Sequence, residues 1–395
     1  MRKNKFIVFL IPSLIVMLLI VGIILFPSDS INAAKNGYKI WTDTLIPSLL
    51  PFIIAANLIV KLKFIDIIGL IINPITRKLF NVSGKSSLVF AISTVSGYPV
   101  GAKLASELRQ NNEISKFEAQ RLVSFCSTSG PLFIVGAVSV GMFNNPPLGY
   151  LILICHYLSA LTVGFLFKNY GRETIICDKT NFNFEVNKII SKRRNENKGF
   201  FVLFGDAVFS GVNTILMVGG FVIVFSVVFK ILSIFNIIEL FSYILHIPLS
   251  LLGFSRELCN AFISGLFEIT IGCSQVSSVL NSPEILRASL CSFLIAFSGL
   301  SILAQCCSFL ATTDINIKTY IFSKFLHGIF ASVFTFAFYP FIKSNNNLIN
   351  LSTHSNLFFN SPSWKIYLNS YHFIIPILII IYILFYIKII KPKKS

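Results

Sequence analysis

The most constraining feature of the chain is a break inside an apolar helical run. The apolar-rich residues 87–96 lead into Gly97 and Pro99, and a second short helical run continues over residues 100–108. A helix that breaks inside a membrane frees backbone N–H and C=O groups, so such a break persists only where protein, water or a ligand supplies partners. The pattern favours a re-entrant helical hairpin that binds a solute. A Gly/Pro kink packed against a neighbouring helix is the alternative.

Composition places this break in a membrane. Of the 395 residues, 54% are hydrophobic and only 12% are charged, and the mean hydropathy is +0.78. These values are typical of a polytopic membrane protein. The formal net charge of +17 would suggest nucleic acid as the partner of a soluble protein, but the basic residues lie in loops between apolar segments. Such a pattern sets membrane orientation, so we expect the lipid bilayer, and no nucleic acid, as a partner.

Eight apolar runs predict transmembrane helices: residues 6–26, 41–60, 122–143, 148–167, 201–229, 286–311, 320–342 and 371–390. The first run follows a basic start without a clear cleavage site, which favours an uncleaved helix over a signal peptide. Residues 64–80 are apolar at helical spacing and predict an interfacial helix. Residues 231–254 are compatible with either an interfacial helix or a further span. The eight cysteines show no C-x-x-C spacing, which indicates small buried hydrophobes and neither disulfides nor metal ligands.

A second hairpin of the same plan follows at residues 256–272. Ser96-Gly97 and Ser264-Gly265 are 168 residues apart, and Ser124-Phe125 and Ser292-Phe293 are separated by the same distance. Weak identity at a constant offset indicates a diverged duplication. We therefore expect five segments: an N-terminal transmembrane helix (1–40), a first repeat with its hairpin (41–168), a cytoplasmic basic linker (169–200), a second, inverted repeat with its hairpin (201–342), and an outside loop with a C-terminal transmembrane helix (343–395).

The distribution of basic residues predicts the orientation. With a cytoplasmic N-terminus, seven of the 33 Lys and Arg residues lie outside: Lys35, Lys39, Lys230, Arg256, Arg287, Lys343 and Lys365. Eight spans then place both termini in the cytoplasm. Three crossings separate the runs 41–60 and 201–229, so the two repeats face opposite ways. The first hairpin enters from the cytoplasm, and the second enters from outside.

Two opposed hairpins, each followed by a helix that breaks at a Ser/Gly cluster, predict a carrier's binding site near the bilayer midplane. Half-helix N-termini carry free N–H groups and the positive end of the helix dipole, so they suit an anionic group. The candidate substrate-binding residues of the first repeat are Ser96, Gly97, Tyr98, Pro99, Gly101, Lys103, Ser127, Thr128, Ser129 and Gly130. Those of the second repeat are Ser264, Gly265, Glu268, Thr270, Ser298 and Gly299.

Glu268 is the sharpest single candidate, because a carboxylate inside a membrane is costly and usually binds an ion, a proton or the substrate. A salt bridge at an aqueous cavity wall is its alternative. Lys103 either binds the substrate or pairs with Glu107, four residues later on the same helical face. We interpret Arg121 as a snorkelling interfacial residue. His156 is a hydrogen-bonded core histidine or, alternatively, part of a proton relay.

Enzyme motifs are absent from the sequence: it contains no H-E-x-x-H, no phosphate-binding P-loop and no G-x-S-x-G. We therefore expect neither an enzyme nor a cofactor, and no direct use of ATP. Uphill transport then requires a coupling ion, Na⁺ or H⁺, or a partner protein.

Five blocks of residues carry a family resemblance: Ser96-Gly97-Tyr98-Pro99-Val100-Gly101-Ala102-Lys103, Ile114-Ser115 with Glu118-Ala119, Ser127-Thr128-Ser129-Gly130-Pro131-Leu132-Phe133-Ile134, His156-Tyr157, and Gly265-Leu266-Phe267-Glu268-Ile269-Thr270. Together they resemble the YlbJ family of sporulation integral membrane proteins, also called stage V sporulation protein V, within the nucleoside-recognition or gate domain superfamily. The resemblance covers about residues 41–342. It implies an all-α polytopic membrane protein similar to concentrative nucleoside transporters, with about eight transmembrane helices plus two re-entrant hairpins in an inverted repeat.

The resemblance also implies a location and a solute. The location is the outer forespore membrane of a spore-forming bacterium, and the solute is dipicolinate, pyridine-2,6-dicarboxylate. The residues by themselves indicate only a carrier of a small polar or anionic solute, which is compatible with a homo-oligomer. Two alternatives stay open: an ion-coupled transporter of nucleosides or nucleobases, and a sporulation membrane scaffold that transports nothing.

Overall fold

The computed structural model of the chain describes residues 2–171, 184, 186–187, 189–191, 199–251 and 253–344. Throughout these residues the regular structure is helical, as the composition predicts. The expected span 371–390 and most of the basic linker lie outside the described residues.

The helices form two runs, one on each side of the linker. The first run is α1 (Arg2–Leu25), α2 (Pro27–Ile40), the π-helical turn η1 (Trp41–Leu45), α3 (Ile46–Lys61), α4 (Phe64–Phe80), α5 (Gly84–Ser96), α6 (Val100–Gln110), α7 (Lys116–Cys126), the π-helical segment η2 (Leu132–Phe143) and α8 (Pro146–Phe167). The second run is α10 (Phe200–Ile234), α11 (Ile237–Ser250), α12 (Arg256–Phe267), α13 (Ile269–Ser278), α14 (Glu284–Phe297), α15 (Gly299–Leu310) and α16 (Ile317–Ser344).

Local capping residues set several of these helix starts. The Ser115 side chain accepts a hydrogen bond from the backbone N–H of Glu118 at the start of α7, and Asn145 caps α8 in the same way. Ser255 caps α12 through the N–H of Leu258. Such caps satisfy N–H groups that have no partner inside the helix, so the loops before α7, α8 and α12 fix where each helix begins.

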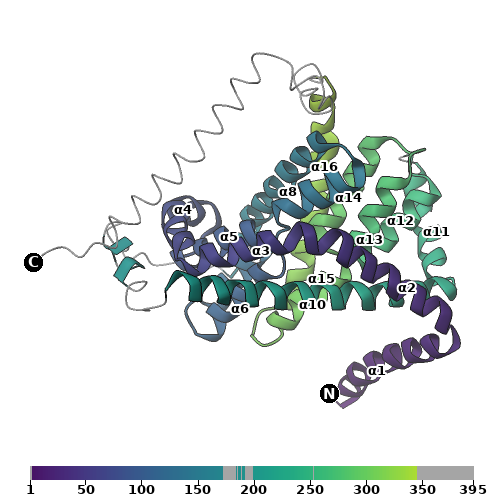
Figure 1. Cartoon of the computed structure of the whole chain (residues 1–395), viewed down its shortest axis with the longest axis horizontal. Coiled ribbons are helices and arrows are strands. Elements are labelled where there is room, and N and C mark those ends of the chain that lie inside the picture. Colours follow the sequence, from purple (N-terminus) through teal and green to yellow (C-terminus); the bar gives the residue numbers. More distant parts are fainter. Residues whose placement is uncertain are drawn as a thin grey trace, which may run out of the picture.

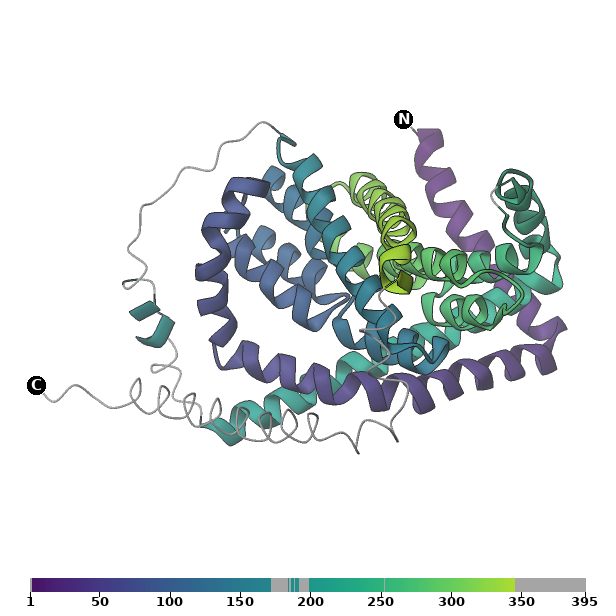
Figure 2. The same ribbon diagram turned by 90° about the horizontal axis from the view of Figure 1, so that it is seen from above.

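Two long helical stretches run side by side along one edge of the molecule (Figures 1 and 2). One is α2, η1 and α3, which follow one another directly, and the other is the 35-residue α10. The Trp41 indole donates a 2.9 Å hydrogen bond to the backbone oxygen of Ile215 across this pair, and its ring packs over Gly219. At 1.5 Å per residue, α10 is roughly 50 Å long, which exceeds the hydrocarbon thickness of a bilayer.

The helix order repeats along the chain. The starts of α13, α14 and α15 follow those of α6, α7 and η2 by 169, 168 and 167 residues. Reciprocal contacts join the two runs: Asn145, after η2, donates a 2.6 Å hydrogen bond to Glu284 at the start of α14. Gln120 of α7 accepts a 2.7 Å hydrogen bond from the N–H of Asn316, after α15. Each run therefore contacts the other through the loop that follows its broken helix.

Each hairpin packs against a helix of the other run. Hairpin 1, formed by α5 and α6, shares a buried apolar cluster with α7 and α15. Hairpin 2, formed by α12 and α13, shares a second cluster with η2, α8 and α14. The two halves are therefore interlocked, with a hairpin of one run resting on the broken helix of the other.

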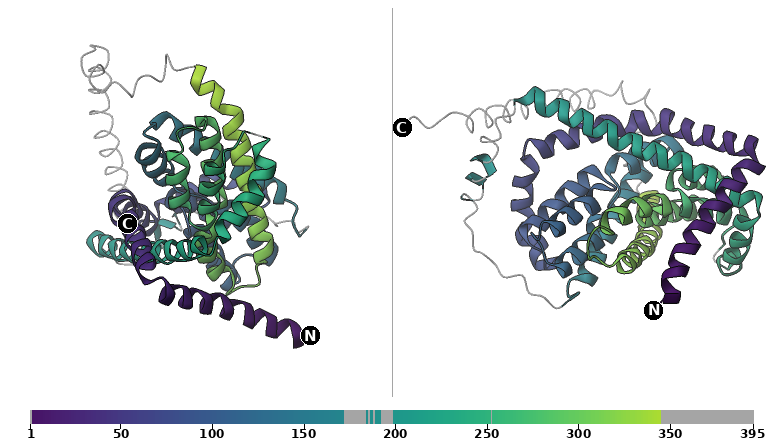
Figure 3. Two further views of the ribbon diagram at one scale, coloured as in Figure 1. Left: turned by 90° about the vertical axis from the view of Figure 1, so that its right-hand side faces the viewer. Right: turned by 90° about the horizontal axis from the view of Figure 1, so that it is seen from below.

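Four helices in the described part of the chain are long and apolar enough to span a membrane: α8, α10, the pair α14–α15, and α16. The pair α1–α2 adds a fifth if it is one bent span, and its bend of 108° carries α1 away from the body of the molecule (Figure 3). The expected span 122–143 is broken between α7 and η2, so neither part reaches the required length. The 14-residue α11 is about 21 Å long, too short to cross a bilayer alone, which favours the interfacial interpretation of 231–254.

Candidate functional site

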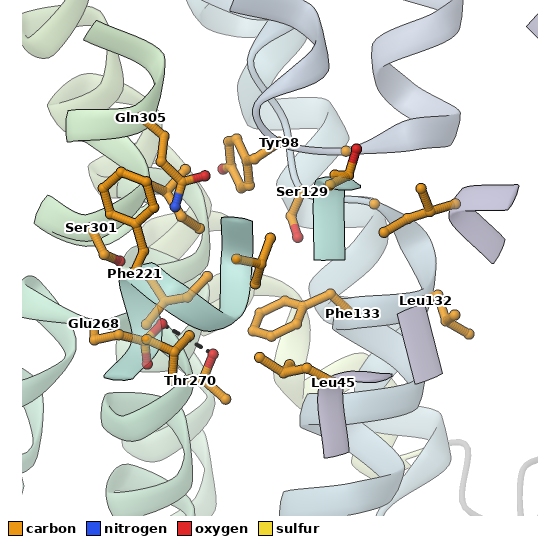
Figure 4. A pocket seen from close by; sticks show the side chains of 18 of the residues that line it. Leu45, Tyr98, Ser129, Leu132, Phe133, Phe221, Glu268, Thr270, Ser301 and Gln305 are labelled. Atoms are coloured by element: carbon orange, nitrogen blue, oxygen red, sulfur yellow. Dashed lines mark hydrogen bonds between the residues drawn. The ribbon is translucent and has the colours of Figure 1, made fainter. Parts of the chain in front are cut away.

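A pocket of about 770 Å³, counting the space open at its mouth, lies where both hairpin tips and both broken helices meet (Figure 4). We call it the central pocket. Its lining comprises Leu45, Ile53, Ser96, Gly97, Tyr98, Ser129, Gly130, Leu132, Phe133, Thr214, Val218, Phe221, Val222, Glu268, Ile269, Thr270, Ser301, Ile302 and Gln305.

Seven of the sixteen candidate residues line the central pocket: Ser96, Gly97, Tyr98, Ser129, Gly130, Glu268 and Thr270. Nine do not: Pro99, Gly101, Lys103, Ser127, Thr128, Ser264, Gly265, Ser298 and Gly299. The structure therefore brings the two hairpin tips together, as the repeat predicts, and gives the other candidates positions behind or beside the tips.

The tip of hairpin 1 is the turn between α5 and α6. Gly97 ends α5 with φ +72°, and a cis peptide bond joins Tyr98 to Pro99. The Tyr98 hydroxyl donates a 2.7 Å hydrogen bond to the backbone oxygen of Ile295 in α14. The tip of hairpin 1 is therefore anchored to the second run of helices.

The tip of hairpin 2 is Glu268, which lies between α12 and α13 and is 2% exposed. Its carboxylate caps α13: one oxygen accepts a 2.8 Å hydrogen bond from the N–H of Ile271, and the other accepts one from the Thr270 hydroxyl. In the described part of the chain no Lys or Arg lies within ion-pair distance of Glu268. A carboxylate has about four acceptor positions, so Glu268 retains capacity for a hydrogen bond from a solute.

Several candidate residues hold the hairpins in place and do not face the central pocket. A Cβ atom on Gly101 would collide with the backbone oxygen of Cys126, so α6 and α7 touch backbone to backbone there. The Ser264 hydroxyl donates to the backbone oxygen of Asn260 within α12. Lys103 is 53% exposed, and its ammonium nitrogen lies 3.9 Å from a carboxylate oxygen of Glu107. Of the two interpretations of this lysine, the structure therefore has the pairing with Glu107.

Two buried basic residues of α16, Lys324 and His327, belong to the site region but did not emerge from the sequence. Lys324 is fully buried, and its ammonium donates a 2.7 Å hydrogen bond to the backbone oxygen of Ser127 in the break of α7. It also lies 3.3 Å from the Tyr98 hydroxyl, and His327 lies 3.2 Å away. The sequence did contain a sign of them, namely a Lys and a His three residues apart inside the predicted span 320–342. Ionisable residues within a membrane are rare and are functional candidates by default.

His156 and Arg121 are both buried. His156 accepts a 3.0 Å hydrogen bond from the backbone N–H of Ser129, so it is a hydrogen-bonded histidine of the core, a position that a proton relay can also use. Arg121 is 1% exposed and donates a 2.7 Å hydrogen bond to the backbone oxygen of Tyr170. Arg121 therefore binds backbone inside the protein and does not snorkel to a lipid headgroup, because the C-terminal end of α8 covers it.

The walls of the central pocket combine aromatic rings with hydroxyl and amide groups. Tyr98, Phe133 and Phe221 supply the rings, and Gln305 and Ser129 lie on opposite sides of the pocket (Figure 4). The starts of η2, α13 and α15 border it, so helix N-termini face the space. Among the described residues no Lys or Arg lines the pocket. The arrangement can hold a planar solute between rings and hydrogen-bond its edges.

Comparisons with known proteins agree with this arrangement. The family model described as "Nucleoside recognition" matches residues 43–143. The fold resembles that of CNTnw, a concentrative nucleoside transporter, solved in an inward-facing substrate-bound state: the TM-score is 0.54 at 13% identity, over 83% of this chain and 84% of that one. A CNTnw variant in an outward-facing state gives a TM-score of 0.51 at 12% identity, over 86% of each chain.

A sequence relative gives the family. The sporulation integral membrane protein YlbJ of Bacillus subtilis is 38% identical over 315 residues, which cover 78% of this chain and 77% of the relative. Identity at this level over most of both chains shows common descent. The chain therefore belongs to the family of the sporulation integral membrane protein YlbJ.

Proposed function

We propose that the chain is a membrane carrier that moves a small planar solute through the central pocket, and that this solute is dipicolinate in the outer forespore membrane. The observation that carries the proposal is the position of the pocket. Both hairpin tips and both broken helices line one space, so the movement of either hairpin exposes the same site. Binding sites at such junctions of broken helices are typical of secondary transporters.

The two repeats would then open the pocket alternately. In the inverted arrangement hairpin 1 closes the pocket toward one side of the membrane, and hairpin 2 closes it toward the other. The tips rest on the broken helices through backbone contacts of Gly97 and Gly265. A hairpin held by such contacts can detach as a rigid unit, which is one form of alternating access.

Dipicolinate fits the shape and part of the polarity of the central pocket. Its flat ring suits the space between Tyr98, Phe133 and Phe221, and its carboxylates suit the N-termini of η2 and α15. An ionised Glu268 carboxylate repels the carboxylates of dipicolinate in the same space. A dianion therefore binds here with a proton on the Glu268 carboxyl group or together with a cation.

A nucleoside or nucleobase is the second candidate, and Glu268 favours it. An ionised carboxylate accepts hydrogen bonds from the N–H and O–H groups of a neutral solute, and Gln305 offers both a donor and an acceptor. The absence of Lys and Arg from the described lining also suits a neutral solute. The matched family model, "Nucleoside recognition", points to the same class of solute.

Uptake by the purified full-length protein in proteoliposomes tests both candidates. Dipicolinate, uridine and adenosine are compared under an imposed proton or sodium gradient, with Glu268→Gln as the site variant. Glu257→Gln, an exposed change in the first turn of the same hairpin, is the matched control. Saturable dipicolinate uptake that falls at least about tenfold in Glu268→Gln only would support the proposal. Uptake of nucleosides alone would select the second candidate, and no uptake of any solute by folded protein would favour a scaffold.

A further inference from the structure

We propose that Lys324, His327 and His156 form the proton-binding site of the carrier, and that the proton on Lys324 controls how firmly hairpin 1 is held. This inference rests on the proposed carrier function and assigns its coupling ion. Its basis is the cluster of these three buried nitrogen bases directly behind the central pocket. None of them lines the pocket, so contact with the solute does not explain why they are there.

The Lys324 ammonium joins three structural elements. Its nitrogen donates to the backbone oxygen of Ser127 at 2.7 Å, to the Tyr98 hydroxyl at 3.3 Å and to His327 Nδ1 at 3.2 Å. The nitrogen also lies 4.9 Å from the centre of the Tyr98 ring, within cation–π range. One side chain of α16 therefore holds the tip of hairpin 1 and the break after α7 together.

Among the described residues no carboxylate balances the positive charge of Lys324. In the described part of the chain no Asp or Glu lies within 4.0 Å of this ammonium. The titratable groups that surround it are Tyr98 on hairpin 1, Cys126 on α7, His156 and Tyr157 on α8, Cys306 on α15, and Tyr320 and His327 on α16. A buried unpaired charge is costly. Lys324 carries that charge only while it holds its third proton.

From Lys324 a chain of hydrogen bonds runs through His327 to His156. His327 Nδ1 accepts from Lys324, so the proton of neutral His327 lies on Nε2, which is 3.0 Å from the backbone oxygen of His156. The N–H of Ser129 donates to His156 Nε2, so the proton of neutral His156 lies on Nδ1. Within the described part of the chain, neither that buried nitrogen nor the buried Thr128 hydroxyl has a hydrogen-bond partner. These two groups are the points of the network with unused hydrogen-bonding capacity.

The network reaches the central pocket at two points. Tyr98 and Ser129 both line the pocket, and they contact Lys324 and His156 respectively. An ammonium group donates three hydrogen bonds, whereas a neutral amine donates only two. Loss of the proton from Lys324 to water therefore removes one donated hydrogen bond and also ends the cation–π contact with the Tyr98 ring, so the hold of Lys324 on hairpin 1 weakens. Protonation and the position of hairpin 1 are thus linked through one side chain.

Two variants and one control test the assignment in proteoliposomes. Lys324→Met removes the base, and His327→Gln replaces an imidazole by a group with one donor and one acceptor that does not titrate. Lys318→Met removes an exposed lysine of the same helix and is the matched control. Solute-driven proton movement, followed with a pH dye inside the vesicles, should fall at least about fivefold in both variants. Exchange of labelled for unlabelled solute without a gradient should persist.

The assignment would be overturned by a wild-type protein driven by sodium and indifferent to the proton gradient. It would also be overturned if Lys324→Met kept full proton movement. A titration that needs no transport separates this inference from the proposed function. Between about pH 5 and about pH 9 the purified wild-type protein should release about one proton more than Lys324→Met, and identical curves would refute the site even if uptake is observed.

Discussion

A Cβ atom on Gly97 would lie 2.7 Å from the backbone nitrogen of Gly130. The tip of hairpin 1 therefore rests on the broken helix backbone to backbone. The same relationship recurs in the second half, where a Cβ atom on Gly299 would lie 2.9 Å from the backbone oxygen of Gly265. Gly97 and Gly265 are 168 residues apart on the two hairpins, and Gly130 and Gly299 lie at the two helix breaks, so close docking of each hairpin is built into both halves.

Replacement of Gly97 by Ala should weaken the docking of hairpin 1. Gly97 has φ +72° and ψ −166°, a region that is open essentially to glycine alone. We expect a loss of roughly 1–3 kcal/mol in the free energy of unfolding, together with reduced uptake. Gly220→Ala on α10 is the control, because no described residue beyond its own stretch of α10 lies within 4 Å of its Cβ position. Thermal unfolding in detergent measures both, and equal melting temperatures for the two variants would contradict the docking role.

Replacement of Glu268 by Ala should reduce both stability and uptake. The variant loses the cap of α13, which costs about 0.5–2 kcal/mol, and it loses the carboxylate of the central pocket. Ser255→Ala is the matched control, because it removes the cap of α12 in the same hairpin from a residue outside the pocket lining. We expect similar losses of melting temperature but a loss of uptake only in Glu268→Ala. A parallel loss of uptake in Ser255→Ala would assign Glu268 a structural role alone.

Much of the fold follows from local patterns. Residues 64–80 are apolar at helical spacing, and α4 occupies Phe64–Phe80. Breaks predicted at Gly97 with Pro99, and at residues 127–131, separate α5 from α6 and α7 from η2, since these residues interrupt an otherwise continuous pattern. The polar residues 27–40 gave no apolar signal, yet they form α2, because α10 packs along this stretch.

The site was less predictable, because it depends on which helix faces meet. Glu268 was found from sequence as a carboxylate inside an apolar hairpin. Thr214 and Phe221 lie on an α10 that is apolar on every face, so nothing local shows which residues turn toward the hairpins. Lys324 was hidden for another reason: a single lysine barely lowers the average hydropathy of a long apolar helix, and its partner Ser127 is 197 residues away.

The ion pair between Arg109 and Asp314 should make stability depend on pH at the acid end. Arg109 binds both carboxylate oxygens, at 2.8 and 3.0 Å, and this hydrogen bonding lowers the pKa of Asp314, which lies in the loop between α15 and α16. Because the pKa of Asp314 is lower in the folded than in the unfolded protein, the pair stabilises the protein at pH values above the unfolded-state pKa of about 3.9. That stabilisation is lost as the pH falls through the lower folded-state value.

Melting temperatures of wild type, Arg109→Gln, Asp314→Asn and the double variant measure this pair. The pair is partly exposed, at 23% and 44%, so solvent screening keeps the gain at neutral pH to at most about 1 kcal/mol. The advantage of wild type over Asp314→Asn should shrink from about pH 5 to about pH 3, and the double variant should lose no more than either single variant. A difference that grows with acidity would have the wrong sign for this pair.

Labelling at two equivalent loops decides whether the repeats are inverted. Asn112, between α6 and α7, and Leu280, between α13 and α14, are 168 residues apart, and both are exposed, Leu280 by 78%. The basic residues predict Asn112 inside and Leu280 outside. In intact cells of a non-sporulating expression host, where the protein inserts into the plasma membrane, a membrane-impermeant maleimide should therefore label Leu280→Cys at once and Asn112→Cys only after permeabilisation, each measured above the parent protein. Most described native cysteines are buried, which keeps that background low. Labelling of both sites from the same side would make the repeats parallel, and the two hairpins would then open to one side of the membrane and could not alternate.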